Sequence, residues 1–570
     1  MSDTPASIES NGAEEFGSAF IGISFGNANS SIAFTKDGKV EVIADQDGYR
    51  SIPSALSYLG GDEYHGFQAK AQLIRNSKNT VVNFRDFIGK KYSEIDPTNS
   101  HVSAHPIEKD GVVGFNLAVS NQEGAEPEFV SVAEITKRHF ARLKEAAAEF
   151  LGKPIEGAVI AVPTDFTSAQ RQALEEIAQS AGINILQTIH EPVAALLAYD
   201  AATAGAFTTD RIVVVADFGS TRSDVAVVAV RGGLYTVLAT AHNYELGGDA
   251  LDKTLVDHFA KEFEKKYNAD PRTESERSLA KLLAEAEVTK KTLSNTNTAT
   301  ISIDSLAAGY DFHSTINRLR FELLARKVFD NVSTFVEDVV KKAGLDVLDV
   351  DEVVLVGGSS HTPKIAARIE SLFAETTVIR SPASSANALN PAELIARGTA
   401  TQASLISGFE KKDIEESIQP VITNAPHISK PIGIVNAEGK FVTILENYTT
   451  VPIRASKVFQ VATGGDFAVD VFEGEEHIVT RKIEKTKAER SEQEDEDDDE
   501  EDDFSDEDEE EREKVVKPVT KIAEAAITSV NDGAKVEVIL NISADLKLGV
   551  VVREIGGQTV RGSIEGNTVA

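Results

Sequence analysis

The 570-residue chain contains no cysteine and no tryptophan. The absence of cysteine excludes disulfides, thiolate metal ligands and thiol nucleophiles, so any chemistry must use oxygen and nitrogen groups. No apolar run approaches the roughly 18 residues needed to span a bilayer. The first residues also lack the basic and apolar regions of a secretory signal. We therefore expect a soluble cytoplasmic protein that contacts no membrane.

Basic side chains are in the minority: 57 lysines and arginines oppose 91 aspartates and glutamates, which gives a net charge of -34. A charge of this sign repels phosphate backbones and argues against direct nucleic-acid binding. Half of the excess lies in residues 492–513, where 18 acidic residues surround the single Arg512. Repulsion among like charges favours a solvated loop for this tract, which we place at 484–515.

Two regions differ in their hydrophobic patterns. After an expected disordered tail at 1–17, short β-branched runs alternate with amphipathic helical patterns over 18–408, which predicts an α/β domain. Thr167 with Gln170 three residues later predicts a helix start, and Gly182 predicts its end. Beyond a linker at 409–419, only short strand patterns remain. Residues 420–570 are therefore predicted to form an all-β sandwich interrupted by the acidic insertion, with no helical lid.

A weak internal repeat with an offset of 193 residues is the most informative feature. Residues 21–26 align with residues 214–219, and each copy reads as strand, Phe-Gly, polar tip, strand. Glycine lets backbone N–H groups approach an anion closely, so two such tips could hold phosphates from opposite sides. Alternatively, each glycine only satisfies a hairpin turn. The tips consist of Gly26, Asn27, Ala28 and Asn29, and of Gly219, Ser220, Thr221 and Arg222.

Two further segments carry candidate binding residues. A buried strand run at 353–356 ends in a Gly-Gly-Ser turn, at the kind of strand end where open α/β sheets commonly bind ligands. Upstream, four polar residues at i, i+3, i+4 and i+7 share one helix face. The alternative for that face is a solvated ion pair at i, i+4. The residues are Gly357, Gly358 and Ser359, and Glu287, Lys290, Lys291 and Ser294.

Together these segments resemble the 70-kilodalton heat-shock chaperone (Hsp70) family, whose ATPase domain shares its fold with actin and hexokinase. IGISFGNANSS resembles the first phosphate loop, DFGSTRSDVAV the second, and VLVGGSSHTPKI the adenosine turn. The resemblance covers Ala19 to about Gly562. It implies an α/β two-lobed actin-like domain that binds ATP, with Mg²⁺ as a possible companion, followed by a peptide-binding-type β-sandwich. His361 falls where the family often has an arginine that stacks on the base.

Several positions depart from the family's catalytic pattern. Ser24 replaces a loop carboxylate that organises the metal's water shell, and Arg85 matches the catalytic lysine, unless it is simply a surface cation. Arg222 replaces a threonine on the phosphate side, where the larger side chain either hinders the close approach of the backbone or supplies a compensating charge. Two acids are retained, Glu191 and Asp217, and the latter is the one candidate for a metal contact through water. Phosphoryl transfer depends on positioning and electrostatics, so the resemblance implies ATP binding with little or no hydrolysis and no confident catalytic residue.

The missing lid and this set of departures resemble the Ssz-type members of the family in fungi. That resemblance implies a stable heterodimer with a J-domain protein of the zuotin type, indirect attachment to the ribosome, and assistance to a ribosome-bound chaperone that folds nascent chains. One alternative is an active ATP-cycling chaperone that binds unfolded polypeptides. Another is a small-molecule kinase of the same ATPase superfamily.

Overall fold

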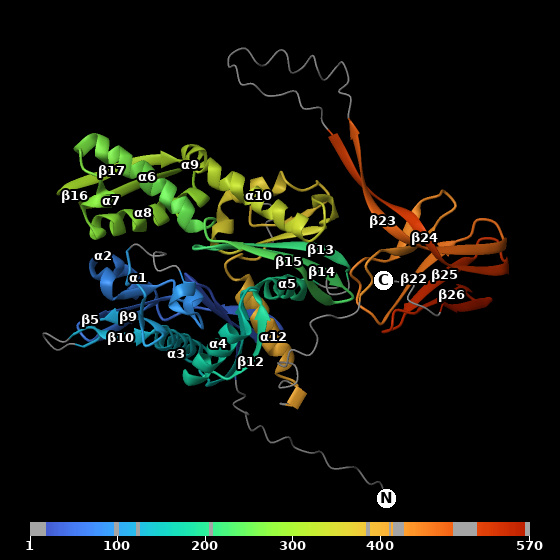
Figure 1. Cartoon of the computed structure of the whole chain (residues 1–570), viewed down its shortest axis with the longest axis horizontal. Coiled ribbons are helices and arrows are strands. Elements are labelled where there is room, and N and C mark those ends of the chain that lie inside the picture. The colour runs from blue at the N-terminus through green and yellow to red at the C-terminus, as the bar shows by residue number, and fades with distance from the viewer. Residues whose placement is uncertain are drawn as a thin grey trace, which may run out of the picture.

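The computed structural model of the chain describes residues 19–95, 102–120, 126–203, 209–383, 388–409, 412–413, 427–482 and 510–564. The predicted tail at 1–17 and most of the predicted linker lie outside these ranges. Figure 1 shows an α/β region in two parts, with the β-rich domain at one side. We call residues 19–190 lobe I and residues 209–383 lobe II. No helix of the described ranges combines the length and the apolar character that a bilayer crossing requires.

Lobe I is built on a sheet with the strand order β12-β11-β1-β2-β3, with β4 beside β2. Two three-stranded sheets, β10-β9-β8 and β6-β5-β7, lie outside it. The strands are β1 (Ala19–Phe25), β2 (Asn29–Lys36), β3 (Lys39–Ile43), β4 (Ile52–Pro53), β5 (Ala55–Leu59), β6 (Asp62–His65), β7 (Thr80–Val82), β8 (Ile107–Lys109), β9 (Val112–Leu117), β10 (Glu128–Ser131), β11 (Ile155–Val162) and β12 (Ile185–His190). The helices are α1 (Gly66–Ala71), α2 (Leu73–Asn76), α3 (Val132–Leu151) and α4 (Ser168–Ser180).

Helix α4 shows how local sequence fixes an element. Its N-cap Thr167 and Gln170 form the predicted capping box, and Gly182 takes a positive φ of 76° just beyond the helix end, so both predictions are confirmed.

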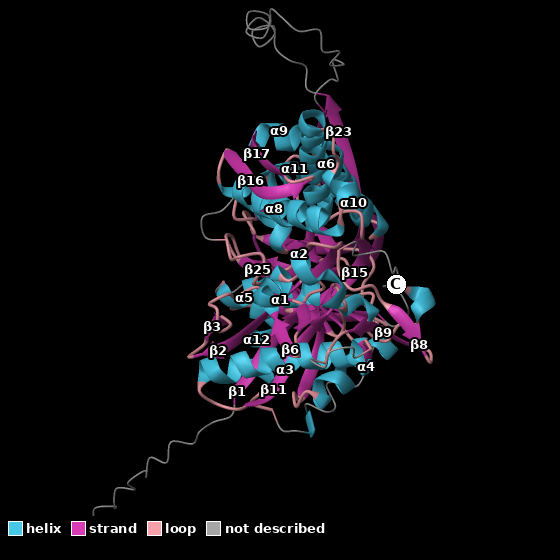
Figure 2. Ribbon diagram, turned by 90° about the vertical axis from the view of Figure 1, so that its left-hand side faces the viewer, coloured by secondary structure: helices cyan, strands magenta, loops and turns pink. Residues whose placement is uncertain are grey.

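Lobe II is built on a sheet with the order β15-β14-β13-β18-β19, and β16 and β17 pair separately. The strands are β13 (Arg211–Phe218), β14 (Ser223–Arg231), β15 (Leu234–Asn243), β16 (Thr298–Ala307), β17 (Tyr310–Asn317), β18 (Glu352–Val356) and β19 (Val378–Arg380). The helices are α6 (Gly248–Tyr267), α7 (Pro271–Glu274), α8 (Glu276–Asn295), α9 (Arg318–Leu324), α10 (Arg326–Lys342) and α11 (Pro363–Glu370). Figure 2 shows these helices above and those of lobe I below.

The two main sheets repeat one topology. In lobe I, β1 pairs antiparallel with β2 and parallel with β11. In lobe II, β13 pairs antiparallel with β14 and parallel with β18. The predicted repeat is thus confirmed as two hairpins at equivalent places in two sheets of the same order. Equivalent placement brings the two hairpin turns to corresponding sheet edges.

Two crossing helices, α5 (Glu191–Ala202) and α12 (Leu394–Ile406), lie between the lobes. Alanine-rich α5 packs on the valines of the lobe II sheet, and α12 packs on β2 and β3 of lobe I. At their crossing, a Cβ on Gly398 would lie 1.7 Å from the carbonyl oxygen of Ala194. A Cβ on Gly22 of β1 would lie 2.1 Å from the backbone nitrogen of Ala400. Glycine therefore sets how closely these backbones approach.

The β-rich domain consists of two four-stranded sheets, and its described residues contain no helix. Apolar side chains of both sheets form one core, with Ile432, Val471, Val538 and Leu540 fully buried. The sheets are ordered β21-β20-β23-β24 and β22-β25-β26-β27. Their strands are β20 (Ile432–Val435), β21 (Phe441–Leu445), β22 (Ile453–Gln460), β23 (Gly465–Lys482), β24 (Glu510–Val530), β25 (Lys535–Ile542), β26 (Leu548–Glu554) and β27 (Thr559–Ile564).

The predicted acidic insertion, 484–515, is too long at its C-terminal end. Strand β24 begins at Glu510, and its backbone pairs with β23 up to the pair Lys482 and Glu510. The predicted boundary rests on charge alone, whereas backbone pairing along a long hairpin does not depend on side-chain charge. The remainder of the tract lies outside the described residues.

The β-rich domain contacts lobe II through polar groups. The buried Arg231, at the end of β14, donates from Nε to the carbonyl oxygen of Asn447 at 3.1 Å. Lys514 of β24 pairs with Asp349 of lobe II at 2.8 Å and with Glu476 of β23 at 3.0 Å. These contacts hold the β-rich domain against lobe II.

We predict that Gly398→Ala lowers the thermal stability of the chain, because the new methyl group would overlap the backbone of α5. Overpacking of this kind costs about 1–3 kcal/mol. The midpoint of thermal unfolding measures the effect. Gly408→Ala is the matched control, because a Cβ there meets no atom within 4 Å. Equal midpoints for the two variants would contradict the close crossing of the helices.

Candidate functional site

The two glycine tips have the same backbone turn. Gly26 N–H donates to the carbonyl oxygen of Asn29 at 3.0 Å, and Gly219 N–H donates to that of Arg222 at 3.1 Å. A Cβ would lie 2.3 Å from the first oxygen and 2.7 Å from the second. Turn geometry alone therefore requires glycine at both positions, as the simpler interpretation of the sequence held.

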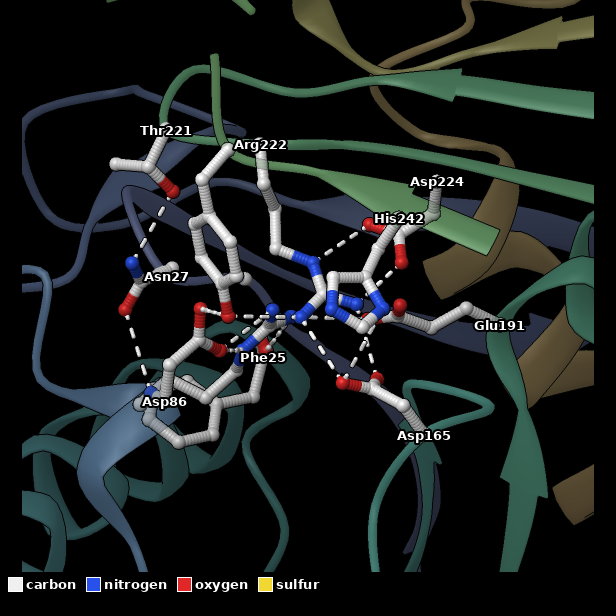
Figure 3. Close-up of polar contacts among 12 residues, drawn as sticks. Phe25, Asn27, Asp86, Asp165, Glu191, Thr221, Arg222, Asp224 and His242 are labelled. Carbon is white, nitrogen blue, oxygen red and sulfur yellow. Dashed lines mark hydrogen bonds and ion pairs between the residues drawn. The ribbon is translucent and has the colours of Figure 1, made fainter. Parts of the chain in front are cut away.

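The tips meet at the junction between the lobes. Asn27 Nδ2 of lobe I donates to Thr221 Oγ1 of lobe II at 3.1 Å, and both side chains are buried (Figure 3). The predicted opposition of the two tips is thus present, but the tips contact each other directly. Ala28 and Asn29 complete the first turn, and β2 begins at Asn29. Among the hydrogen bonds of the described residues, none joins either side chain to lobe II.

The second tip is tied to the start of α6 and to the Gly-Gly-Ser turn. The backbone N–H of Gly248 donates to the carbonyl oxygen of Gly219 at 2.9 Å, and that of Asp249 to Ser220 at 3.0 Å. Ser359 Oγ donates to the same carbonyl oxygen of Gly219 at 2.7 Å. Three segments separate in the sequence therefore converge here, as expected for a binding site at strand ends.

Lys290 connects the predicted helix face to the same place. Its ammonium group donates to Asp252 Oδ2 at 2.7 Å and to the carbonyl oxygen of Gly248 at 3.0 Å. Burial raises the pKa of Asp252 to about 6, although the charge of Lys290 opposes this. The second oxygen of this carboxylate, Oδ1, is buried and has no hydrogen-bond partner in the described structure.

Glu287 joins the lobes at a second point. It accepts from Lys70 of α1 at 2.8 and 2.9 Å and from Lys291 at 2.7 Å. Burial works to raise the pKa of Glu287, but the two lysine charges lower it to about 2. The expected i, i+4 pair is thus present, with a partner from the other lobe that sequence reasoning missed.

Two predicted binding residues do not converge on the turn. Ser294 Oγ donates to the carbonyl oxygen of Lys290 in its own helix. His361 is exposed, and its Nε2 lies 3.0 Å from Asn390 Oδ1. Gly357 has a φ of 83°, and a Cβ there would lie 2.3 Å from Asp217 Oδ1. Around Gly358 the space is open, because a Cβ there would meet no atom within 4 Å.

Arg85 is buried, so the interpretation of this residue as a surface cation is wrong. Its Nε donates to Asp86 at 2.8 Å, and its Nη1 donates to Glu191 at 3.1 Å and to the carbonyl oxygen of Phe25 at 3.4 Å. The retained acid Glu191 begins α5, directly after β12. The position that matches the family's catalytic lysine is therefore occupied by a cation already paired with the chain's own carboxylates.

The acids at this junction outnumber the cations. Burial raises the pKa of Glu191 to about 7 despite Arg85. Burial and the nearby carboxylates of Glu191 and Asp224 raise the pKa of Asp217 well above its usual value. Thr164, Thr240 and these three acids line a cavity of about 10 Å³, the size of one water molecule.

Sequence reasoning missed several residues of this network: Lys70, Asp86, Asp165, Asp224, Tyr244 and Asp252. Asp86 and Asp165 lie in segments that resemble the family, and Asp224 follows the second tip. The available signal in the sequence was the negative charge of these aspartates, which is opposite to the charge of Arg85 and Arg222. Only the fold shows which of these charged groups are in contact.

A buried chain of polar groups leads from the first tip into lobe I. Ser54 Oγ donates to the carbonyl oxygen of Gly26 at 2.8 Å and lies 2.9 Å from Ser30 Oγ. Ser30 Oγ lies 2.9 Å from His139 Nε2, and His139 Nδ1 lies 2.7 Å from His65 Nε2. Burial lowers the pKa of His65 to about 4 and that of His139 well below its usual range. Both imidazoles are therefore neutral in the folded protein at neutral pH.

The adenosine side has features that fit a nucleotide. The unpartnered acceptor on Asp252 suits a ligand that brings a hydroxyl or an amine, and the open space at Gly358 admits a close approach to the backbone. Among the described residues no three His, Asp or Glu side chains are placed to share one metal ion. A contact of Asp217 with a metal through water stays a prediction.

The fold and the site define a chaperone of the Hsp70 class, with a nucleotide-binding-type α/β region of two matching sheets followed by a β-rich domain. The family model described as Hsp70 protein matches residues 20–488, and the chain belongs to this family. Members of the family generally bind ATP or ADP with Mg²⁺.

Three relatives illustrate the similarity. The chain is 48% identical over 549 residues to the ribosome-associated complex subunit SSZ1 of Saccharomyces cerevisiae, covering 96% of this chain and 100% of that protein. It is 44% identical over 548 residues to a heat shock protein 70 homologue of Schizosaccharomyces pombe, with 95% of each covered. It is 33% identical over 446 residues to heat shock 70 kDa protein 14 of Danio rerio, covering 78% and 86%. The resemblance to the Hsp70 family and to its Ssz-type members is confirmed.

We predict that the contribution of His65 to the free energy of unfolding falls as the pH drops from about 6.5 towards about 4, whereas the raised pKa values of Glu191 and Asp252 act in the opposite direction. The folded chain keeps the His65 imidazole neutral in this window because its pKa is lowered to about 4, whereas the unfolded chain takes up a proton. Each such proton contributes a slope of about 1.4 kcal/mol per pH unit. His65→Gln should change the slope of the free energy of unfolding against pH by the contribution of one proton. Denaturant titrations at several pH values measure this slope.

His313→Gln is the control for this experiment, because His313 is exposed on β17. A wild-type slope that His65→Gln leaves unchanged would show that this imidazole is not held neutral by the fold.

Proposed function

We propose that this protein is an ATP-binding co-chaperone with little or no hydrolysis. In this proposal it forms a stable heterodimer with a zuotin-type J-domain protein at the ribosome, in the cytoplasm, and assists a ribosome-bound chaperone in the folding of nascent chains. The single observation that carries the proposal is the buried ion-pair network of Arg85 and Arg222, at the positions where the family has a catalytic lysine and a threonine.

Nucleotide binding is supported by the adenosine side of the junction. Lys290, Asp252 and Gly248 form a buried set of polar contacts beside the Gly-Gly-Ser turn. Ser359 of that turn bonds the second tip. These residues would hold the base and the ribose, because they offer fixed donors and one acceptor without a partner.

The contacts of the two arginines on the phosphate side of the junction support the proposed loss of hydrolysis. ATP supplies the phosphoryl group when it binds, and its transfer requires cations free to stabilise the developing charge. Both arginines donate to the chain's own carboxylates, and Ser24 brings no negative charge for a metal's water shell. Displacing several charged groups at such a site lowers turnover by several powers of ten, so the enzyme activity is expected to be lost.

The partner is supported by the similarity to SSZ1, whose name states that it is a subunit of the ribosome-associated complex. The identity of 48% extends over nearly the whole of both chains, so the two proteins share the fold on which their binding surfaces are built. The net charge of -34 suits attachment through a partner and not through RNA directly. We assign this chain the same kind of assembly.

Lys290→Ala should weaken ATP binding by about tenfold, since it removes a charged hydrogen-bond donor from the base side. Titration calorimetry with ATP measures the affinity. Lys253→Ala is the matched control, because Lys253 is exposed on α6, the helix that Lys290 contacts. Equal ATP affinities of the two variants would show that the base does not bind beside Lys290.

Single-turnover assays should detect no ADP formation above background, with or without an added J-domain protein. A J-domain protein should co-elute when the chain is purified from its native host. ADP formation stimulated by a J-domain would instead establish the alternative, an active ATP-cycling chaperone, and recovery of the chain alone would contradict the heterodimer.

A further inference from the structure

The side chain of Arg222 is 4% exposed and lies between the lobes. It starts from the turn between β13 and β14 in lobe II and donates to both carboxylate oxygens of Asp165 in lobe I, at 2.9 and 3.4 Å. It also donates from Nε to Asp224 of β14 at 2.8 Å, with a further bond from Nη2 (Figure 3). Its Nη1 donates to Tyr244 Oη at 3.0 Å. Every N–H group of the guanidinium thus has an acceptor within the chain.

Tyr244 extends the connection into lobe I. Its hydroxyl accepts from Arg222 and donates to Asp86 Oδ2 at 3.0 Å, and Asp86 in turn accepts from Arg85. The Arg222 guanidinium also lies 5.3 Å from the centre of the Tyr244 ring. Arg222 therefore reaches lobe I by two routes, directly through Asp165 and through the tyrosine hydroxyl.

A third contact comes from the neighbouring residue of the same turn, because Thr221 accepts from Asn27 of lobe I. These three contacts across the junction depend on the turn that carries Arg222. The pair of Lys70 with Glu287 and the contact of Thr164 with Thr240 at 2.6 Å join the lobes elsewhere. The family usually has a threonine at the position of Arg222. A threonine has no guanidinium group and could not bond to Asp165 and Tyr244 as Arg222 does. Asp165 and Asp224 would then lack the cation that they share.

We propose that Arg222 is a clasp that holds lobe II against lobe I in the absence of nucleotide. Closure of the lobes is then a built-in property of the chain and not a response to ATP. A ligand shifts an equilibrium only by its different affinity for the two states, so a chain that is already closed leaves ATP little to shift. This inference concerns the ligand-free chain and does not require the proposed ATP binding.

The lack of cysteine makes the distance between the lobes directly measurable. Asp62→Cys on lobe I and Thr300→Cys on lobe II place one spin label on each lobe at exposed strand positions. Pulsed electron paramagnetic resonance on the full chain then gives the distribution of distances. We expect one narrow distribution without nucleotide and the same distribution with saturating ATP.

Adding Arg222→Thr should shift the nucleotide-free distribution to longer distances and broaden it. Arg326→Thr is the matched control, because the Arg326 side chain on α10 of the same lobe is 75% exposed, and it should leave the distribution unchanged. Tyr244→Phe removes one hydroxyl and keeps all charges. It should broaden the distribution less, and it keeps the test valid if Arg222→Thr fails to fold.

A broad nucleotide-free distribution in the parent chain that narrows when ATP is added would overturn the clasp. So would a distribution that neither Arg222→Thr nor Tyr244→Phe changes. A parent chain that stays closed but binds no ATP in calorimetry would leave the clasp in place and refute the proposed function instead, so the two failures are distinguishable.

Discussion

The structure depends on the pairing of two buried arginine side chains with carboxylates at the lobe junction. Arg85 and Arg222 are both buried at the lobe junction, and a buried guanidinium is stable only where carboxylates and other acceptors surround it. Asp86, Glu191, Asp165 and Asp224 supply those acceptors from four different segments. The junction is consequently organised by the chain's own charges.

This constraint is the physical basis of the proposal that the site binds ATP without hydrolysing it. The adenosine side requires only fixed polar groups and space, which Lys290, Asp252 and Gly358 provide. Hydrolysis requires cations and a metal-ordering carboxylate that respond to a reacting phosphate. A cation whose donors are all committed to internal acceptors does not offer them to a substrate.

The duplicated sheet gives the junction its geometry. Two sheets of the same strand order present their hairpin turns to each other, and α5 and α12 set the spacing between them through the contact of Gly398 with Ala194. The duplicated hairpins suggested from the sequence that two turns could hold phosphates between them. In the structure, the same two hairpins place Asn27 within hydrogen-bond distance of Thr221. The lobes and the charge network are thus parts of one arrangement.

The sequence by itself determined the class of fold, because hydrophobic periodicity, capping residues and an internal repeat are local signals. It located both hairpins, the start and end of α4, and the family, and it placed Ser359 and Lys290 in segments that do converge. The acidic insertion was predicted too long because charge does not report backbone pairing.

Only the tertiary structure decided which charges meet. Asp165 lies 57 residues from Arg222 and Lys70 lies 217 residues from Glu287, so no spacing rule relates them. It likewise showed that Arg85 is buried, and that turn geometry by itself explains both tip glycines. Contacts between distant segments follow from how sheets and helices pack, and packing is a property of the whole chain.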